Sequence, residues 1–254
     1  MPSPTHPIVQ CQRSLQGWYA GPAGREMLAA MRGHVNRFVP QLFGYYALQI
    51  GHLNQGIDLL EDSRIGRRFL VGSGPGEGDL AALPEALPVE ADTLDLVLLV
   101  HTLEGAVDPH QVLREVERTL RPEGHVIILG LNPLSPVGLW EMMPGRRGRT
   151  PWAGPCYSTG RVREWLSLLG FDIMALAHAG VRPPEGRSGL RPRVQILQGL
   201  GGRRLPYLGA VYMILARKRV STLTPVRPRW RAVRPWVPGG FARPVCRRRE
   251  RDGN

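Results

Sequence analysis

The stretch DLVLLVHTLEGAVDPHQVLREVERTLRPEGHVIIL, residues 95–129, decides the fold because it holds two apolar strands around one amphipathic helix. Residues 95–100 are a continuous apolar run with β-branched members, which is typical of a central strand buried on both faces of a parallel sheet. Asp108-Pro109 then opens a helix, with Asp as the N-cap and Pro at the first helical position. A second apolar strand follows at residues 126–129. Strand, helix and strand of this length predict a βαβ unit with a right-handed crossover.

Further elements alternate on both sides of this unit. Apolar residues at helical spacing, together with capping residues, predict helices over residues 24–43, about 55–62 and 158–169. Short apolar runs predict strands at residues 45–50, 68–71, 171–176 and 210–216, the last two as a hairpin. The expected fold class is therefore α/β: a Rossmann-like, doubly wound, mostly parallel sheet with a terminal antiparallel hairpin.

The net charge of +12 is concentrated at one end of the 254-residue chain. Residues 217–254 hold 12 Lys or Arg against Glu250 and Asp252, so the rest of the chain is close to neutral. Nearly all the basic residues are Arg, a bias that a GC-rich genome produces as readily as phosphate recognition does.

We expect a loose leader at residues 1–16 and one domain over residues 17–219. A basic, disordered tail at residues 220–254 should follow, because its Arg/Pro/Trp mixture cannot bury a core.

The cysteines exclude two classes of small protein. Cys11, Cys156 and Cys246 are odd in number and widely scattered, which argues against a disulfide scaffold and a structural zinc site. No metal site is expected.

The longest apolar runs are too short to span a membrane, and the N-terminus lacks the features of a signal peptide, so the expected location is the cytoplasm.

A series of short motifs follows the chain from residue 87 to residue 125. In order they are Leu87-Pro88, Asp95-Leu96-Val97, His101-Thr102-Leu103-Glu104, Asp108-Pro109, Leu113-Arg114-Glu115 and Arg118 to His125. In order and spacing they resemble the second half of class I S-adenosylmethionine-dependent methyltransferases, specifically the type 11 methyltransferase domain. With the helix and strand at residues 158–173, the resemblance covers roughly residues 45–176.

The resemblance implies S-adenosylmethionine as cofactor and transfer of its methyl group to an acceptor that the sequence does not identify. The positions that match the family's cofactor pocket are Gly51, His52, Gly56, Leu87 and His101. No catalytic residue is assigned, because in-line methyl transfer depends mainly on positioning.

The loop after the first strand departs from the family pattern D/E-x-G-x-G-x-G. Gly51 holds the first glycine position, Gln49 replaces the acid, and Leu53 and Gln55 stand at the other two glycine positions. Gly56 is one residue away and could compensate in part. A leucine side chain would crowd the approach that glycines permit.

Two further carboxylates of the family are missing. Gly72 and its neighbours stand where an acid should bind the ribose hydroxyls, and Leu83 matches the acid that faces the adenine. Asp79 and Glu77 lie near these positions and are candidates to replace them.

Several residues keep two interpretations. His101 is a catalytic base or a wall residue, Glu104 is a site residue or a solvated residue leading into a helix, and Trp18 and Tyr19 cover the cofactor mouth or staple a helix to the core. Two other functions also remain open. The domain could be an inactive binding module, or the Arg/Trp tail could make weak contact with nucleic acid.

Overall fold

The computed structural model describes residues 6–51, 53, 58–72, 78–135, 138, 155–179 and 209–219. The chain divides into a unit at residues 1–220 and a second at residues 221–254, and all described residues belong to the first. The tail, His52 and Gly56 lie outside the described residues, so the boundaries of the expected domain and tail stay predictions.

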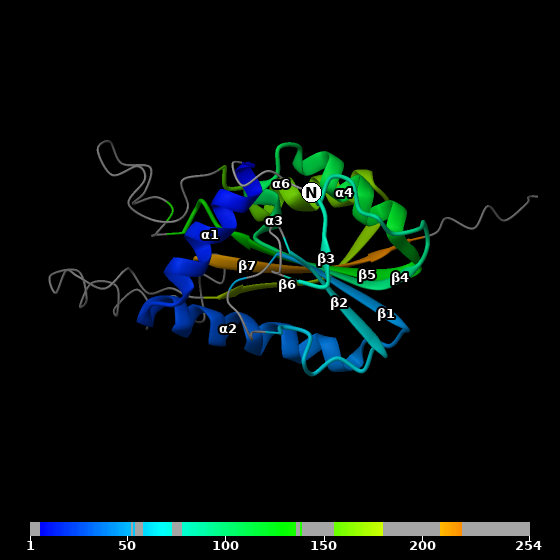
Figure 1. The fold of residues 1–254 in the computed structure, drawn as a ribbon, viewed down its shortest axis with the longest axis horizontal. Helices are drawn as coiled ribbons and strands as arrows, with labels where there is room; N and C mark the ends of the chain where they lie inside the picture. Colours follow the sequence, from blue (N-terminus) through cyan, green and yellow to red (C-terminus); the bar gives the residue numbers. More distant parts are fainter. Residues whose placement is uncertain are drawn as a thin grey trace, which may run out of the picture. The chain divides into compact units, whose positions relative to one another are not determined.

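A seven-stranded sheet forms the centre of the first unit, in the order β3-β2-β1-β4-β5-β7-β6 (Figure 1). Its strands, in chain order, are β1 (Tyr46–Ile50), β2 (Arg67–Gly72), β3 (Leu80–Ala81), β4 (Leu94–Val100), β5 (Leu120–Leu131), β6 (Phe171–Ala179) and β7 (Val211–Lys218). Strands β1 to β5 run parallel, and β7 pairs antiparallel with both β5 and β6. The predicted fold class is confirmed, with β7 inserted between β5 and β6.

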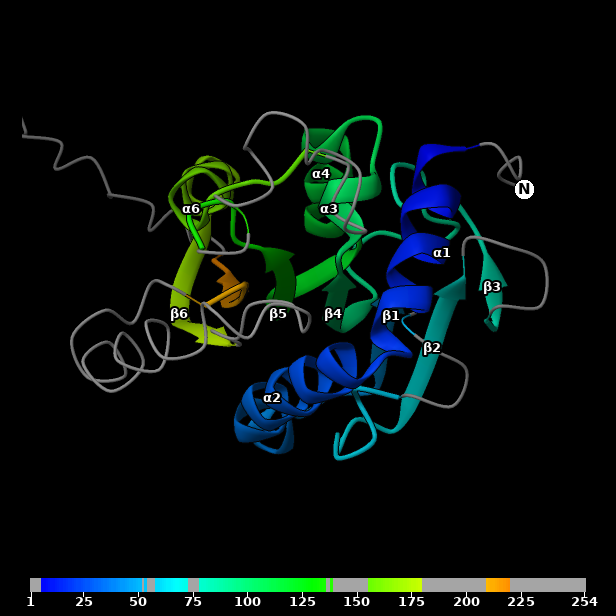
Figure 2. The same ribbon diagram turned by 90° about the vertical axis from the view of Figure 1, so that its left-hand side faces the viewer.

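Helices cover both faces of this sheet (Figures 1 and 2). One face carries α2 (Pro22–Phe38), which the 3₁₀ turn η1 (Val39–Gln41) extends, and the other carries α4 (Pro109–Thr119) and α6 (Thr159–Leu168). The Asp108 carboxylate caps α4 by accepting hydrogen bonds from the His110 and Gln111 backbone amides. The Ser158 hydroxyl caps α6 in the same way. Both caps confirm the sequence prediction, because these side chains satisfy amides that a helix start leaves free.

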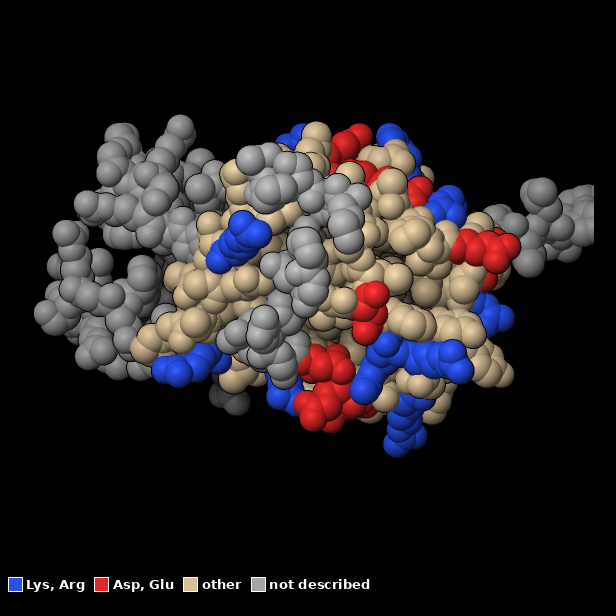
Figure 3. Space-filling model, in the orientation of Figure 1, with Lys and Arg blue, Asp and Glu red and all other residues tan. Residues whose placement is uncertain are grey.

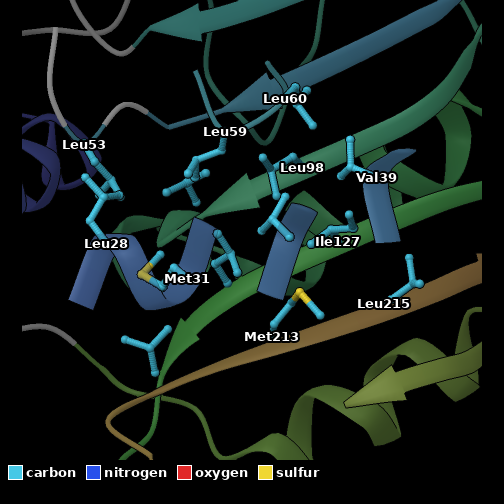
Figure 4. Close-up of a cluster of buried hydrophobic side chains, with 14 of the residues drawn as sticks. Leu28, Met31, Val39, Leu53, Leu59, Leu60, Leu98, Ile127, Met213 and Leu215 are labelled. Carbon is cyan, nitrogen blue, oxygen red and sulfur yellow. The ribbon is translucent and has the colours of Figure 1, made fainter. Parts of the chain in front are cut away.

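The central strand β4 supplies side chains to two separate apolar clusters. Leu96 and Leu98 belong to the cluster under α2, in which Figure 4 shows Leu98 with Met31, Ile127 and Met213. Val97 and Leu99 belong to the cluster under α4 and α6. This alternation on a strand with two buried faces is what the continuous apolar run predicted.

Two expectations about the first third of the chain are wrong. Residues 7–19, placed mostly in a loose leader, form helix α1 (Pro7–Tyr19). The helix expected over residues 55–62 is absent from its described part, since residues 59–62 form turns and Asp58 is in neither a helix nor a strand. The Leu59 and Leu60 side chains from these turns fill the α2-side core that a helix would otherwise cover.

Candidate functional site at the carboxyl edge of the sheet

Helix α1 lies across the carboxyl ends of the central parallel strands (Figure 2). It packs against the short helix α3 (Thr102–Gly105), which follows β4 directly. A Cβ added at Gly105 would lie 3.1 Å from the Cα of Ile8, so the two helices are in close contact. The open edge of such a sheet is where α/β folds bind ligands. In this chain α1 covers that edge.

His101 ends β4 beneath this helix. Its φ of 48° lies in the left-handed region, which costs free energy for a residue with a Cβ, and its side chain is fully buried. Its Nε2 is 2.8 Å from the Tyr19 hydroxyl of α1, and the two rings are stacked with centroids 5.7 Å apart. Strain of this kind is held in place by surrounding contacts and is often found at functional sites. The hydrogen bond between Tyr19 and His101 is consistent with both interpretations of Tyr19: a residue that covers the entrance to the cofactor site, and one that fixes a helix to the core.

Glu104 lies one turn further, with its side chain 2% exposed. The Leu131 backbone amide donates to its Oε1 at 2.6 Å, and the same oxygen is 3.9 Å from Nδ1 of His101. Its Oε2 and the His101 Nδ1 have no hydrogen-bond partner among the described residues. The interpretation of Glu104 as a solvated helix lead is wrong. Its burial depends on β5, which is distant in sequence, so no local signal reveals it.

The carboxylate of Glu104 affects its neighbours on several elements. Burial, reinforced by Glu104, raises the pKa of the Cys11 thiol to about 12. The same two causes raise the pKa values of the Tyr19 and Tyr212 phenols above their ordinary range, burial again being the larger. These groups therefore stay neutral around the carboxylate.

Gln49 places a second polar side chain at this edge, at the end of β1. Its Nε2 donates to the Gly51 carbonyl oxygen at 3.2 Å, and the residue is 4% exposed. That bond orients the amide, and no described residue donates a hydrogen bond to the remaining Oε1. The position thus keeps a buried acceptor although the family's carboxylate has been lost.

Gly51 follows with a φ of 97°. A Cβ here would overlap the Val100 carbonyl oxygen and would lie 3.1 Å from Nε2 of Gln12 in α1. The retained glycine is therefore required where β1 passes β4 and α1.

Leu53 and Leu87 occupy core positions. Leu53 is 3% exposed and lies beside Leu28 of α2 (Figure 4), so it fills the apolar cluster on that face. The Leu87 backbone amide donates to Glu115 and its carbonyl accepts from Arg118, both on α4. Glu115 and Arg118 therefore hold the backbone of Leu87, which is a structural reason for their presence in the motifs. A cofactor role for Leu87 stays a prediction, as do those of Gly51 and His101.

The structure gives little support to Asp79 or Glu77 as replacements for the missing carboxylates. Asp79 accepts from the Leu70 backbone amide at 2.8 Å and donates its own amide to the Leu70 carbonyl, so it fastens the edge of β2. Glu77 lies outside the described residues. Within the described part of the chain no cluster of three potential metal ligands occurs, and no helix there could span a membrane.

Comparison with known families and proteins adds three findings to this geometry. The family model described as "Methyltransferase domain", type 11, matches residues 71–128. The uncharacterised protein YafS of Escherichia coli K12 is 30% identical over 207 residues, which cover 82% of each chain.

Solved structures with the same fold include an S-adenosylmethionine-dependent methyltransferase from Thermotoga maritima, at a TM-score of 0.57 and 16% identity. That match covers 84% of this chain and 100% of the other. They also include the [4+2]-cyclase SpnF, at a TM-score of 0.56 and 15% identity, which covers 87% of this chain and 98% of the other. At these identities the matches establish the fold, and the second shows that the fold serves more than one chemistry.

Proposed function

The chain belongs to the class I S-adenosylmethionine-dependent methyltransferases, as a type 11 member in one family with YafS, and from this premise we propose that it binds S-adenosylmethionine and transfers its methyl group. The cofactor would bind beneath α1, at the carboxyl ends of β1 and β4. The methyl acceptor is not identified.

The observation that carries the proposal is the pair of buried acceptor atoms without partners at this edge, Oε1 of Gln49 and Oε2 of Glu104. Buried polar atoms nearly always have hydrogen-bond partners, so orphaned ones grouped at a ligand-binding edge indicate a missing donor. The α-ammonium group of S-adenosylmethionine supplies donors of this kind.

The edge fits the two ends of the cofactor unequally. At the methionine end, Gln49 offers an acceptor and Gly51 keeps the backbone free of a Cβ. At the adenosine end, Gly72 and Leu83 stand where the family has carboxylates, so the ribose and adenine would be held there without charge-assisted bonds. We expect binding that is weaker than in relatives with the full set of acids.

When bound, the cofactor would supply an electrophilic methyl group on a sulfonium, which a nucleophilic acceptor would take in line, leaving the sulfur as a neutral thioether. The residues of this chain would bind and orient the cofactor and would exclude water from the site. Gln49 would fix the amino-acid end, and α1, fastened by the Tyr19–His101 bond, would keep bulk water from the edge. Such positioning contributes most of the catalysis in a transfer of this type, so no acid or base at the methyl group is required.

Calorimetric titration with S-adenosylmethionine tests the proposal. We expect a micromolar dissociation constant for the wild type and a clear weakening in Gln49→Leu, which removes the acceptor and keeps the size. Gln41→Leu is the matched control, because Gln41 is an exposed residue of η1 and should leave the affinity unchanged. Absence of binding at millimolar ligand would contradict the proposal.

A second function, an inactive binding module, rests on the sequence, which has Gln49 in place of the family's acid and Leu53 and Gln55 in place of two glycines. The Leu53 side chain is packed into the α2-side core, so the crowding expected from it is not observed. This alternative predicts a partner protein and no S-adenosylmethionine binding. Nucleic-acid contact through the tail stays a prediction, and it would show as a steep salt dependence lost on truncation after Arg219.

A further inference from the structure

Three aromatic side chains are exposed close together where β1 begins, at the end of the sheet opposite the carboxyl edge. Phe43, Tyr45 and Tyr46 have relative exposures of 69%, 71% and 36%. The first two lie in the loop between η1 and β1, and the Tyr46 ring stacks on Phe69 of β2 with centroids 6.4 Å apart. Large apolar groups that are exposed together on a soluble domain commonly mark a binding surface.

The backbone that carries these rings is fixed by the sheet. The Asp95 carboxylate accepts hydrogen bonds from the Tyr45 and Tyr46 amides, and the Tyr45 carbonyl oxygen accepts from the Arg67 amide at 2.9 Å. These bonds form without any ligand. The rings are therefore already ordered, which reduces the entropy that a ligand would have to overcome.

Two arginines lie among the rings. The Arg64 guanidinium is 5.7 Å from the centre of the Phe43 ring, and Arg67 opens β2 directly beside Tyr46 in the register of the sheet. Both arginines are exposed, and neither has a carboxylate within 4.0 Å among the described residues. Exposed cations beside exposed rings suit an anion that also has flat apolar groups.

The acidic residues near this end of the sheet are engaged by other groups. Asp95 binds the two tyrosine amides and Arg121. The remaining described contacts are those of Asp58 with Arg68, Glu61 with Arg32 and Asp62 with Asn36. In Figure 3, basic side chains gather next to acidic ones over the loop that leads into β2. The charges of Arg64 and Arg67 are therefore left for a ligand.

The chemistry of the exposed side chains indicates what kind of anion fits. Within the described part of the chain, the large exposed apolar side chains at this end are all aromatic, whereas the exposed aliphatic ones lie on other elements: Val107, Leu134, Leu168 and Met174. A face that binds a membrane buries aliphatic as well as aromatic side chains. Surfaces that bind single-stranded nucleic acid instead combine aromatic rings, on which bases stack, with arginines that pair with phosphates.

We propose that this aromatic–arginine patch, formed by Phe43, Tyr45, Tyr46, Arg64 and Arg67, binds single-stranded nucleic acid. Bases would stack on the exposed rings, and Arg64 and Arg67 would pair with the phosphates. The strand β7 ends beside the start of β5, so the Arg-rich residues 220–254 are attached to the domain at this same end of the sheet. The patch is remote from the carboxyl edge, so this inference and the proposed function can fail independently.

The test is fluorescence anisotropy of the full-length chain with a labelled oligodeoxythymidylate of about twelve nucleotides, within the range of known site sizes. We expect Tyr45→Ala to weaken binding at least fivefold. Arg67→Gln should reduce the slope of log affinity against log salt by about 0.7. The matched controls on α6, Leu168→Ala and Arg163→Gln, alter exposed residues and should change neither quantity. Residues 220–254 are present in every variant, so the differences report on the patch.

A crosslinking measurement locates the contact directly. An oligonucleotide that carries 5-iodouracil should crosslink to Phe43 or Tyr45, as identified by mass spectrometry, and a duplex of the same length should bind more weakly than the single strand. Crosslinks confined to residues 220–254, or an affinity that neither Tyr45→Ala nor Arg67→Gln changes, would overturn the assignment. So would the absence of oligonucleotide binding in a protein that binds phosphatidylglycerol vesicles through Tyr45, since the patch would then dock on a membrane.

Discussion

Gly51 combines two constraints that exclude other residues. Its φ of 97° disfavours any residue with a Cβ, and that Cβ would overlap the Val100 carbonyl oxygen. The family resemblance assigns this glycine to the cofactor, but the contact with β4 requires it even without a ligand.

Gly51→Ala should therefore destabilise the protein by about 2 kcal/mol or more, since left-handed strain alone costs about 1–2 kcal/mol. Urea unfolding followed by circular dichroism measures the change. Gly33→Ala is the matched control, because Gly33 lies inside α2 with open space around it, and the change should stabilise by about 0.5–1 kcal/mol. Equal stabilities of wild type and Gly51→Ala would contradict the geometry.

Tyr19 fastens α1 to the end of β4 through its hydroxyl. Tyr19→Phe would leave Nε2 of the buried His101 without this partner, and such a loss costs about 1–3 kcal/mol. Thermal unfolding should show the loss, whereas Tyr45→Phe, at an exposed tyrosine, should have almost no effect. If the two variants melt at the same temperature, the hydrogen bond contributes nothing to the docking of α1.

At the scale of elements, Asp95 joins three strands at their starting ends. Its Oδ2 accepts hydrogen bonds from the Tyr45 and Tyr46 backbone amides at 2.7 and 3.0 Å, which fixes β1 against β4. Its Oδ1 accepts from Arg121 of β5 at 3.2 Å. An aspartate in this otherwise apolar strand is therefore a structural residue of the sheet.

Asp95→Ala should lower the free energy of unfolding by about 2 kcal/mol, because two amides lose a charged acceptor. Arg121→Ala removes the half-exposed partner alone and should cost less than about 1 kcal/mol. Both values come from urea denaturation. A larger loss for Arg121→Ala than for Asp95→Ala would show that the ion pair, and not the amide bonds, holds the strands.

The elements that the sequence predicted well are those with a regular apolar period. The unit β4–α4–β5 was predicted because β4 is apolar apart from Asp95 and the helix has a capping residue and a clear buried face. Helix α1 was missed because its buried face includes Gln12, so the apolar period is broken in the middle. Its helical stability comes from packing on α3, which the local sequence does not encode.

At the scale of the whole molecule, the charges of the domain are mixed. Figure 3 shows basic and acidic side chains of described residues in neighbouring groups on one face of the domain. The two halves of the domain differ in how closely they follow the family pattern. Residues 71–128 match the family model, whereas the loop after β1 has Gln49 in place of the family's acid. The burial of Glu104 could not be predicted because it depends on β5, which is distant in sequence.

Alkaline pH should destabilise this molecule. The thiol of Cys11 and the phenols of Tyr19 and Tyr212 have raised pKa values in the folded state, so they ionise first in the unfolded chain. Stability is then full below about pH 9 and is lost as pH rises above it, by at most about 1.4 kcal/mol per pH unit for each group. The urea midpoint should fall between pH 8 and pH 11, and less steeply in Cys11→Ala. A midpoint independent of pH would contradict the burial of these groups.

The central claim, that the closed edge beneath α1 is a cofactor site, is tested most directly by a crystal structure of the chain with S-adenosylmethionine. We predict electron density for the ligand over the carboxyl ends of β1 and β4, in contact with Gln49, Gly51 and Glu104. A ligand bound elsewhere, or an edge that holds no ligand at saturating S-adenosylmethionine, would contradict it.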